Sequence, residues 1–176
     1  KNYDRFYKVR DRFQAYLDKE SLKPLWYERK TSEGGYKVHN MYRYMQDKGV
    51  VYTQANNSKE PFEADTLDID ACTFDVLTSI YAARNIDYDK YEINEEIPIT
   101  MIVDNEIYDL YIRYLGRETI KLKTGRVFRT VKFSPLLVEG TIFKGGEQMT
   151  VWVTDDKNRL PVMIEAKILV GSVKAV

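Results

Sequence analysis

The chain of 176 residues contains little of what metal, redox and acid–base chemistry usually requires. It has one histidine and one cysteine, so neither a histidine-rich zinc site nor an intrachain disulfide can form. No Gly-x-Ser-x-Gly motif is present to mark the nucleophile of a hydrolase. We therefore expect a non-enzymatic protein with no catalytic residue, no cofactor and no metal site.

Net charge and long apolar runs are also missing. The 27 Lys and Arg residues balance 27 Asp and Glu residues, so no global positive field would attract a phosphate backbone. No apolar run approaches the roughly 18 residues that a membrane-spanning helix needs. We expect neither nucleic acid as a partner nor a membrane span.

The charges are nevertheless uneven along the chain. Residues 60–96 carry eleven acidic and only two basic side chains, whereas the segments on either side are basic. Calcium would favour such a carboxylate-rich segment, but neither acidic cluster has the spacing and glycine of an EF-hand loop. The prediction is a solvated acidic rim.

Length and composition predict a single soluble domain over residues 1–176, without a linker or a repeat. The dominant pattern is alternation of apolar and polar residues, interrupted by turn residues, which is typical of antiparallel strands. We count roughly ten or eleven strands, at residues 6–17, 25–31, 36–45, 50–56, 97–103, 107–115, 118–123, 126–133, 136–143, 151–166 (a hairpin) and 167–176. The double glycine at Gly145 and Gly146 is expected to form a positive-φ turn.

A single amphipathic helix is predicted over Ala71–Arg84. Phe74, Leu77 and Tyr81 recur at helical spacing, and Asp70 stands where an N-cap would. Cys72, near its start, is expected to be a small buried side chain. The predicted fold is mainly β (α+β): a single strongly curved antiparallel sheet, or an open β-barrel of roughly ten strands, wrapped around this helix.

Two adjacent carboxylates, Asp155 and Asp156, stand between apolar stretches in "VWVTDDKNRLPVMIEA". If Asp156 and Lys157 occupy the centre of a hairpin, Val151 faces Val162 and every pair on that side is apolar. The two carboxylates then belong to the turn, where Asp can bond its own backbone and Asn158 can tolerate a left-handed conformation. Trp152 falls on the less apolar side, where a groove, a second layer or a partner would meet it.

Tyrosine is abundant, with 14 residues, and is often interleaved with charge. A tyrosine ring with a polar tip suits the rim of a groove or stacking on a sugar, although strands favour tyrosine for purely structural reasons. His39 is expected on the same strand face as Lys37 and Arg43, without a catalytic role. Basic side chains on two adjacent strands suit an anionic ligand or a solvated face: Lys121, Lys123, Arg126, Arg129 and Lys132.

Much of the chain resembles an exported bacterial family known as domain of unknown function 3108. The resemblance rests on "CTFDVLTSIYAARNID", "IYDLYIRYLGRETIKLKTG", the run from "VEGTIF" to "GSVKA" and the opening "FQAYLDKESLKPLWYERKTSEGGY". It implies export to a Gram-negative envelope, periplasmic or associated with the outer membrane, after removal of a leader. The implied fold is similar to open β-barrel carriers of lipoproteins, and the resemblance assigns no activity.

Three functions follow as hypotheses. The first is an envelope protein that binds lipid or another apolar or amphipathic ligand between sheet and helix, through Phe74, Leu77, Tyr81, Tyr111 and Trp152. The alternative is a surface module that presents a Tyr- and Arg-rich sheet face to a glycan or an envelope protein. An enzyme is the least favoured, because only scattered carboxylates such as Asp109 and Glu139 could serve it.

Overall fold

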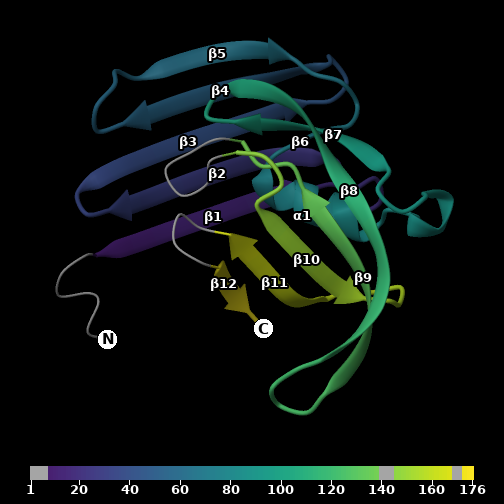
Figure 1. Ribbon diagram of the computed structural model, residues 1–176. Coiled ribbons are helices and arrows are strands. Elements are labelled where there is room, and N and C mark those ends of the chain that lie inside the picture. The colour runs from purple at the N-terminus through teal and green to yellow at the C-terminus, as the bar shows by residue number, and fades with distance from the viewer. Residues whose placement is uncertain (1–7, 139–144, 168–171) are drawn as a thin grey trace. The chain divides into compact units, whose positions relative to one another are not determined.

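The computed structural model describes residues 8–138, 145–167 and 172–176, and it confirms a mainly β protein with one α-helix in this part of the chain (Figure 1). The helices are α1 (Val76–Arg84) and η2 (Tyr88–Lys90), a single 3-10 turn. The strands are β1 (Val9–Leu17), β2 (Pro24–Glu33), β3 (Tyr36–Met45), β4 (Val50–Asn57), β5 (Glu63–Asp68), β6 (Thr73–Phe74), β7 (Glu96–Val103), β8 (Glu106–Lys121), β9 (Val127–Pro135), β10 (Met149–Thr154), β11 (Pro161–Lys167) and β12 (Ser172–Ala175).

The chain divides into two compact units. Unit 1 comprises residues 1–81 and 100–107, and unit 2 comprises residues 82–99 and 108–176. The chain passes between the units three times, so α1, β7 and β8 each contribute residues to both. That residues 1–176 form one domain stays a prediction.

The strands form two sheets, and neither closes on itself. One sheet has the order β1-β2-β3-β4-β5, and the other has the order β12-β11-β10-β9-β8-β7-β6. The expected single sheet or open barrel is therefore not confirmed. Alternation indicated most of the strands, but it missed β5 and does not specify which strand ends a sheet. The first sheet ends at β5, whose side chains are almost all exposed and include Glu63, Asp65 and Asp68.

The five-stranded sheet belongs to unit 1 and is a meander in which each strand is antiparallel to the next (Figure 1). One face of this sheet carries the unit's apolar core, where Tyr27 stacks on Tyr42 with ring centroids 5.1 Å apart. Tyr44, Val51 and Ile102 complete the buried cluster. Several tyrosines therefore serve packing, as β propensity predicts.

A tight turn between β7 and β8 also contributes to unit 1. Asp104 and Asn105 both have positive φ, the requirement of a type I′ hairpin. The Asp104 carboxylate accepts hydrogen bonds from Asn40 Nδ2 at 2.7 Å and Arg29 NH1 at 3.1 Å. A turn between the strands predicted at 97–103 and 107–115 is thus confirmed, and its first residue anchors the turn to β2 and β3.

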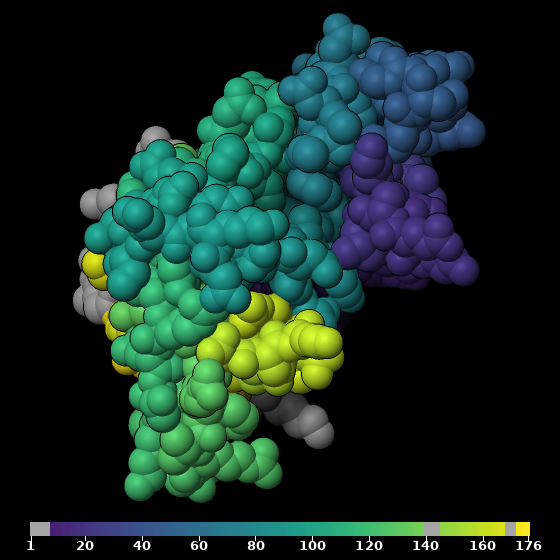
Figure 2. Space-filling view, turned by 90° about the vertical axis from the view of Figure 1, so that its right-hand side faces the viewer, coloured from purple at the N-terminus to yellow at the C-terminus, as the bar shows by residue number. Residues whose placement is uncertain are grey.

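Unit 2 has a core of its own. Tyr88 from η2 is fully buried against Tyr114 and Phe133, with ring centroids 5.5 and 5.8 Å away. Gly116 has φ +93 at a bulge in the β8–β9 ladder, where an added Cβ would come within 3.3 Å of Ile93. Because this glycine absorbs the bulge, the two strands predicted at 107–115 and 118–123 are one continuous strand. The tip of the β8–β9 hairpin extends beyond the neighbouring strands at the bottom of Figures 1 and 2.

Helix α1 begins later than predicted. The helix starts at Val76 rather than Ala71, and Asp75 replaces Asp70 as the capping residue. The buried Asp75 carboxylate accepts hydrogen bonds from the backbone N–H groups of Leu77 and Thr78 at 2.9 and 3.0 Å. Burial raises the pKa of Asp75, although those hydrogen bonds oppose the shift.

The residues before the helix form β6, which pairs in parallel with β7 through Thr73–Thr100 and Phe74–Met101. This pair departs from the expected wholly antiparallel arrangement. A β-branched and an aromatic residue favour a strand over a helical turn, which accounts for the delayed start. Cys72 is exposed and not buried as expected, because it precedes the strand and lies off the helix.

Other local predictions have mixed outcomes. Gly145 and Gly146 have φ +77 and +79, which confirms the positive-φ turn. Most of the strand predicted at residues 136–143 and part of the one at 167–176 lie outside the described residues. The acidic segment is more than a solvated rim, since it includes the buried cap Asp75 and the arginine-paired Asp89 and Glu96.

Candidate functional site: the exposed face of the five-stranded sheet

The second face of the five-stranded sheet carries a row of large side chains across four strands. Tyr16 of β1 is in register with Trp26 of β2, Trp26 with Arg43 of β3, and Arg43 with Tyr52 of β4. We call these four residues the aromatic row. Because neighbouring strands lie about 4.8 Å apart, the row spans about 14 Å.

The aromatic row is accessible to solvent. Tyr16 is 61% exposed, Tyr52 is 43% exposed, and Trp26 is half-buried with its ring centroid 5.2 Å from that of Tyr16. Arg43 is exposed and makes no ion pair with any residue that the structure describes. Rings with polar tips beside a guanidinium group offer both stacking and hydrogen-bonding contacts to a ligand.

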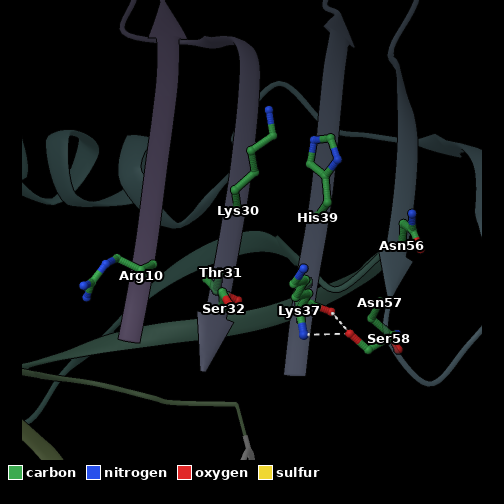
Figure 3. A pocket seen from close by; sticks show the side chains of 10 residues that line it. Arg10, Lys30, Thr31, Ser32, Lys37, His39, Asn56, Asn57 and Ser58 are labelled. Carbon is green, nitrogen blue, oxygen red and sulfur yellow. Dashed lines mark hydrogen bonds between the residues drawn. The ribbon is translucent and has the colours of Figure 1, made fainter. Parts of the chain in front are cut away.

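Farther along the same strands lies an open hollow of about 480 Å³, which we call the basic hollow (Figure 3). Figure 3 shows Lys30, His39 and Asn56 side by side on β2, β3 and β4. Among the described residues that line it, none carries a carboxylate: Arg10, Lys30, Thr31, Ser32, Lys37, Val38, His39, Asn56, Asn57 and Ser58.

Backbone contacts hold one end of the basic hollow in place. The Lys37 N–H donates to Ser58 Oγ at 2.8 Å, and the Ser58 N–H donates to the Lys37 carbonyl at 3.0 Å. The Lys37 ammonium makes no ion pair within the described part of the chain. The structure therefore fixes the backbone beneath this cation and leaves its charge available.

Glu28 lies between the aromatic row and the basic hollow. Its carboxylate accepts hydrogen bonds from Lys30 Nζ at 2.6 Å and from His39 Nε2 at 3.0 Å. The hydrogen bond from Lys30 lowers the pKa of Glu28, so the carboxylate is ionised at neutral pH. The prediction that His39 shares a face with Lys37 and Arg43 is confirmed by the ladder.

The two faces of this sheet have opposite charge. By register, the exposed face carries five cations and two carboxylates, those of Glu28 and Asp68. The core face carries one cation, Arg29, and four carboxylates. The five cations are Arg10, Arg12, Lys30, Lys37 and Arg43, and the four core-face carboxylates are Asp11, Glu33, Glu63 and Asp65. A positive sheet face is thus present although the net charge of the chain is zero.

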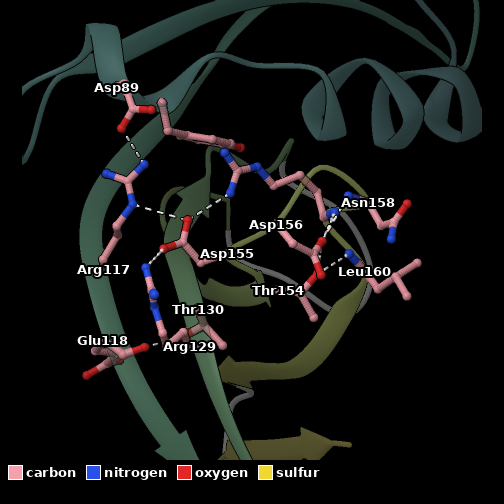
Figure 4. A network of polar contacts seen from close by, with 12 residues as sticks. Asp89, Arg117, Glu118, Arg129, Thr130, Thr154, Asp155, Asp156, Asn158 and Leu160 are labelled. Atoms are coloured by element: carbon pink, nitrogen blue, oxygen red, sulfur yellow. Dashed lines mark hydrogen bonds and ion pairs between the residues drawn. The ribbon is translucent and has the colours of Figure 1, made fainter.

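Unit 2 contains a second hollow, of about 370 Å³, where cations and carboxylates alternate. Asp155 is one of its lining residues, and its carboxylate accepts hydrogen bonds from Arg159 NH1 at 3.0 Å, Arg117 Nε at 3.2 Å and Arg129 NH2 at 3.2 Å (Figure 4). Arg117 also binds Asp89 at 2.6 Å. We call Asp155 and its three arginines the arginine network.

Asp155 is therefore more than the turn residue that the sequence predicted. Burial acts to raise the pKa of Asp155, but the hydrogen bonds from Arg159 and Arg117 outweigh it, and its pKa is lowered. The three partners come from β8, β9 and the β10–β11 turn, so spacing in the sequence gave no signal of the network.

Asp156 stabilises the turn, as predicted. Its Oδ1 accepts the N–H groups of Asn158 and Arg159 and the hydroxyl of Thr154. This turn lies on the surface in Figure 2. The left-handed residue is Arg159, with φ +48, and not Asn158.

The register predicted for this hairpin is wrong by two residues at Val151, which pairs with Ile164 rather than Val162, and by one residue at Val153, which pairs with Pro161. A bulge between Trp152 and Val153 separates the two registers. Val151 and Val153 nevertheless both enter the core, as the predicted alternation along β10 requires.

Trp152 occupies the other face, as predicted, but it is buried. Its indole N–H donates to Glu118 Oε1 at 2.6 Å, and the Lys132 ammonium lies 5.3 Å from the ring centroid. The hydrogen bond from Trp152 lowers the pKa of Glu118. The side chains of Glu118 and Lys132, on β8 and β9, therefore cover the Trp152 ring.

The residues proposed for an apolar site fall into both units. In unit 1, Phe74 belongs to β6, Leu77 packs against the core cluster, and Tyr81 is 46% exposed. In unit 2, the Tyr111 hydroxyl donates to Glu147 at 2.9 Å. Trp152 is in register with Lys132 and Lys132 with Gly116, five residues along β8 from Tyr111, so these two rings are not neighbours.

None of these five residues lines either hollow described above, and their ligand-binding role stays a prediction. Asp109 lies exposed on β8, whereas Glu139 is outside the described residues. Within the described ranges, no group of three or more His, Cys, Asp or Glu side chains could hold a metal ion. No helix there is long and apolar enough to cross a membrane.

Fold and site together define a mainly β protein of two open sheets, one of which presents an aromatic and cationic face to solvent. The model of the family described as protein of unknown function DUF3108 matches residues 1–176, and the chain belongs to that family. No curated protein and no solved structure gave a significant match.

Proposed function

We propose that the chain is a non-enzymatic binding protein of the Gram-negative cell envelope that binds saccharides on the exposed face of its five-stranded sheet. The aromatic row carries this proposal. Exposed rings on neighbouring strands suit the apolar faces of pyranose rings, and their hydroxyl groups suit sugar hydroxyls.

The next cross-strand row strengthens the proposal. Gln14 of β1 is in register with Glu28, which is in register with Met41, and Met41 with Gln54 of β4. The amide groups of Gln14 and Gln54 can each donate and accept hydrogen bonds, as recognition of sugar hydroxyls requires. A flat surface of rings bordered by amides suits an extended saccharide better than a compact ligand.

A glycan array tests this proposal directly. We expect the chain to bind a subset of oligosaccharides and the double variant Tyr16→Ala/Tyr52→Ala to bind them about tenfold more weakly, because two stacking surfaces are lost. Tyr36→Ala is the matched control, since Tyr36 is 40% exposed but lies on the opposite face by register. Unchanged binding by the double variant, or no binding by the wild-type chain, would refute the proposal.

Tryptophan fluorescence offers a second readout in solution. Trp26 and Trp152 are the two tryptophans of the chain, so Trp152→Phe leaves Trp26 as the sole reporter. We expect saccharides that bind in the array to change Trp26 emission and to saturate. Emission that is unaffected by a saccharide bound in the array would place the site elsewhere.

Binding of an apolar or amphipathic ligand at α1 is a second candidate function. The observation that favours it is the pair Ile80 and Tyr81, which are 50% and 46% exposed on the helix. Mass spectrometry of gently purified protein should then detect lipid, and Ile80→Asp/Tyr81→Asp should release it. Protein that carries no lipid when purified from a lipid-rich extract would contradict this function.

The envelope location rests on the resemblance to an exported family. Fractionation of the bacterium that makes the protein should place it in the periplasm or with the outer membrane. Recovery in the cytosolic fraction, beside a cytosolic marker enzyme, would contradict this location.

A further inference from the structure

The basic hollow and the aromatic row lie on one sheet face, and the same strands run through both. Lys30 is four residues from Trp26 along β2, and Lys37 is six residues from Arg43 along β3. At about 3.4 Å per residue, the two features are about 14 to 20 Å apart. A single extended molecule that lies along the strands would therefore reach both.

The cations of this face are distributed along that path. Arg43 stands within the aromatic row, and Arg12, Lys30 and Lys37 follow at the other end. Arg12, Lys37 and Arg43 make no ion pairs with described residues, and the hollow has no carboxylate among the described residues that line it. An occupant with anionic groups at more than one position would complement this charge.

We infer that the ligand of this face is an acidic oligosaccharide, whose rings contact the aromatic row and whose anionic groups bind in the basic hollow. The inference rests on the proposed saccharide-binding function and names the chemical class of its ligand. The anionic groups are carboxylates or phosphates, since ammonium and guanidinium groups bind both.

The roles of the two features then differ. Stacking on Tyr16 and Tyr52 is insensitive to salt and to the charge of the sugar. Ion pairs with Lys37, and with Lys30, whose ammonium Glu28 already neutralises in part, are formed at an open surface and weaken as salt screens them. Binding should accordingly have a salt-independent part and a salt-dependent part.

Isothermal titration calorimetry with three probes of equal length separates these parts. The probes are hexagalacturonate, its fully methyl-esterified neutral form and a phosphorylated hexamannose. We expect at least one anionic probe to bind about tenfold more tightly than the neutral one at low salt, with the advantage lost at high salt.

The double variant Lys30→Met/Lys37→Met should remove the same tenfold advantage and leave the affinity for the neutral probe unchanged. Lys121→Met/Lys123→Met is the matched control, because it removes two exposed charges from the β8–β9 hairpin and should bind like the wild-type chain. Circular dichroism of each variant verifies folding.

The outcomes distinguish the two proposals. Equal affinity for the neutral and both anionic probes, unaffected by Lys30→Met/Lys37→Met, would overturn the acidic ligand and leave saccharide binding standing. An equal loss in both lysine variants would also overturn it, since net charge alone would then act. Failure of all three probes, together with an array without hits, would overturn the proposed function itself.

Discussion

The basic hollow of unit 1 and the hollow around Asp155 in unit 2 are both lined by cations but use them differently. In unit 2, Arg117, Arg129 and Arg159 share the carboxylate of Asp155, so their charges are neutralised within the protein. In unit 1, Glu28 pairs with Lys30 and His39, but Lys37 makes no ion pair with a described residue and lines a hollow without any carboxylate among its described lining residues. A basic residue is therefore a binding candidate only when its own chain does not supply the counter-charge.

Burial distinguishes the Asp155–Arg159 pair from the cations of the sheet face, although Arg129 of the same network is 81% exposed. The Asp155 and Arg159 side chains are 11% and 14% exposed, so each would be costly to leave unpaired. The cations of the sheet face are exposed, and water solvates them at little cost. The comparison predicts that unit 2 variants change stability, whereas unit 1 variants change binding.

The largest effect is expected from Asp155→Asn. Loss of the carboxylate leaves three guanidinium groups without their common partner, which should lower the free energy of unfolding by about 2 to 3 kcal/mol. Urea denaturation measures the change. Asp156→Asn is the control, because asparagine supports the same turn, and it should cost less than about 0.5 kcal/mol. Similar losses in both variants would show that the network contributes nothing beyond the turn.

The same network should make the protein sensitive to acid. The pKa of Asp155 is lowered in the folded state, so its stabilising contribution is complete above the unfolded pKa of about 3.9 and is lost as pH falls through the folded value. The wild-type chain should therefore lose more stability than Asp155→Asn between neutral pH and the acid range. Parallel pH profiles of the two proteins in denaturation experiments would contradict this expectation.

Trp152→Phe should have an intermediate effect. The substitution removes the indole N–H that donates to Glu118 but preserves an aromatic ring, and we expect a loss of about 1 kcal/mol. Thermal unfolding measures it. Combination with Glu118→Met should cost less than the sum of the two single changes, because methionine has no oxygen acceptor and both changes remove the same hydrogen bond. Strict additivity would mean that the hydrogen bond contributes no stability.

The smallest effect on stability is expected from Lys37→Met. An exposed ammonium that makes no ion pair with the described residues contributes little, so the free energy of unfolding should change by less than about 0.5 kcal/mol. Denaturation under the conditions used for Asp155→Asn gives the direct comparison. A loss as large as that of Asp155→Asn would show that Lys37 has a structural role, and the contrast between the hollows would fail.

Alternation predicted the faces of individual strands well. It placed His39 with Lys37 and Arg43, and Trp152 opposite Val151, as the ladders confirm. The helix start was missed because Thr73 and Phe74 pair with β7, a contact between residues 27 positions apart in the chain. The spacing of residues within one segment does not show which distant strand pairs with it. The sequence therefore gave no signal that Asp75, rather than Asp70, caps the helix.

The candidate site could be predicted only in part. An alternating pattern indicated strands that carry Tyr and Arg, yet the aromatic row exists only because four strands pair in one register. A shift of two residues between β1 and β2 would separate Tyr16 from Trp26 without exposing any core residue. The hairpin of Trp152 shows that such differences occur, since Val151 and Trp152 pair two residues away from the predicted register.

The sequence by itself determined that the chain is mainly β, that it has one α-helix in the described residues, and which residues share a face in the strands of His39 and Trp152. Those properties depend on near neighbours, because side chains alternate with period two and turns use local chemistry. Only the tertiary structure decided that Asp155 pairs with three arginines while the cations around Lys37 face solvent. Pairing of charges depends on strands brought together from distant parts of the chain, and composition counts those charges without placing them.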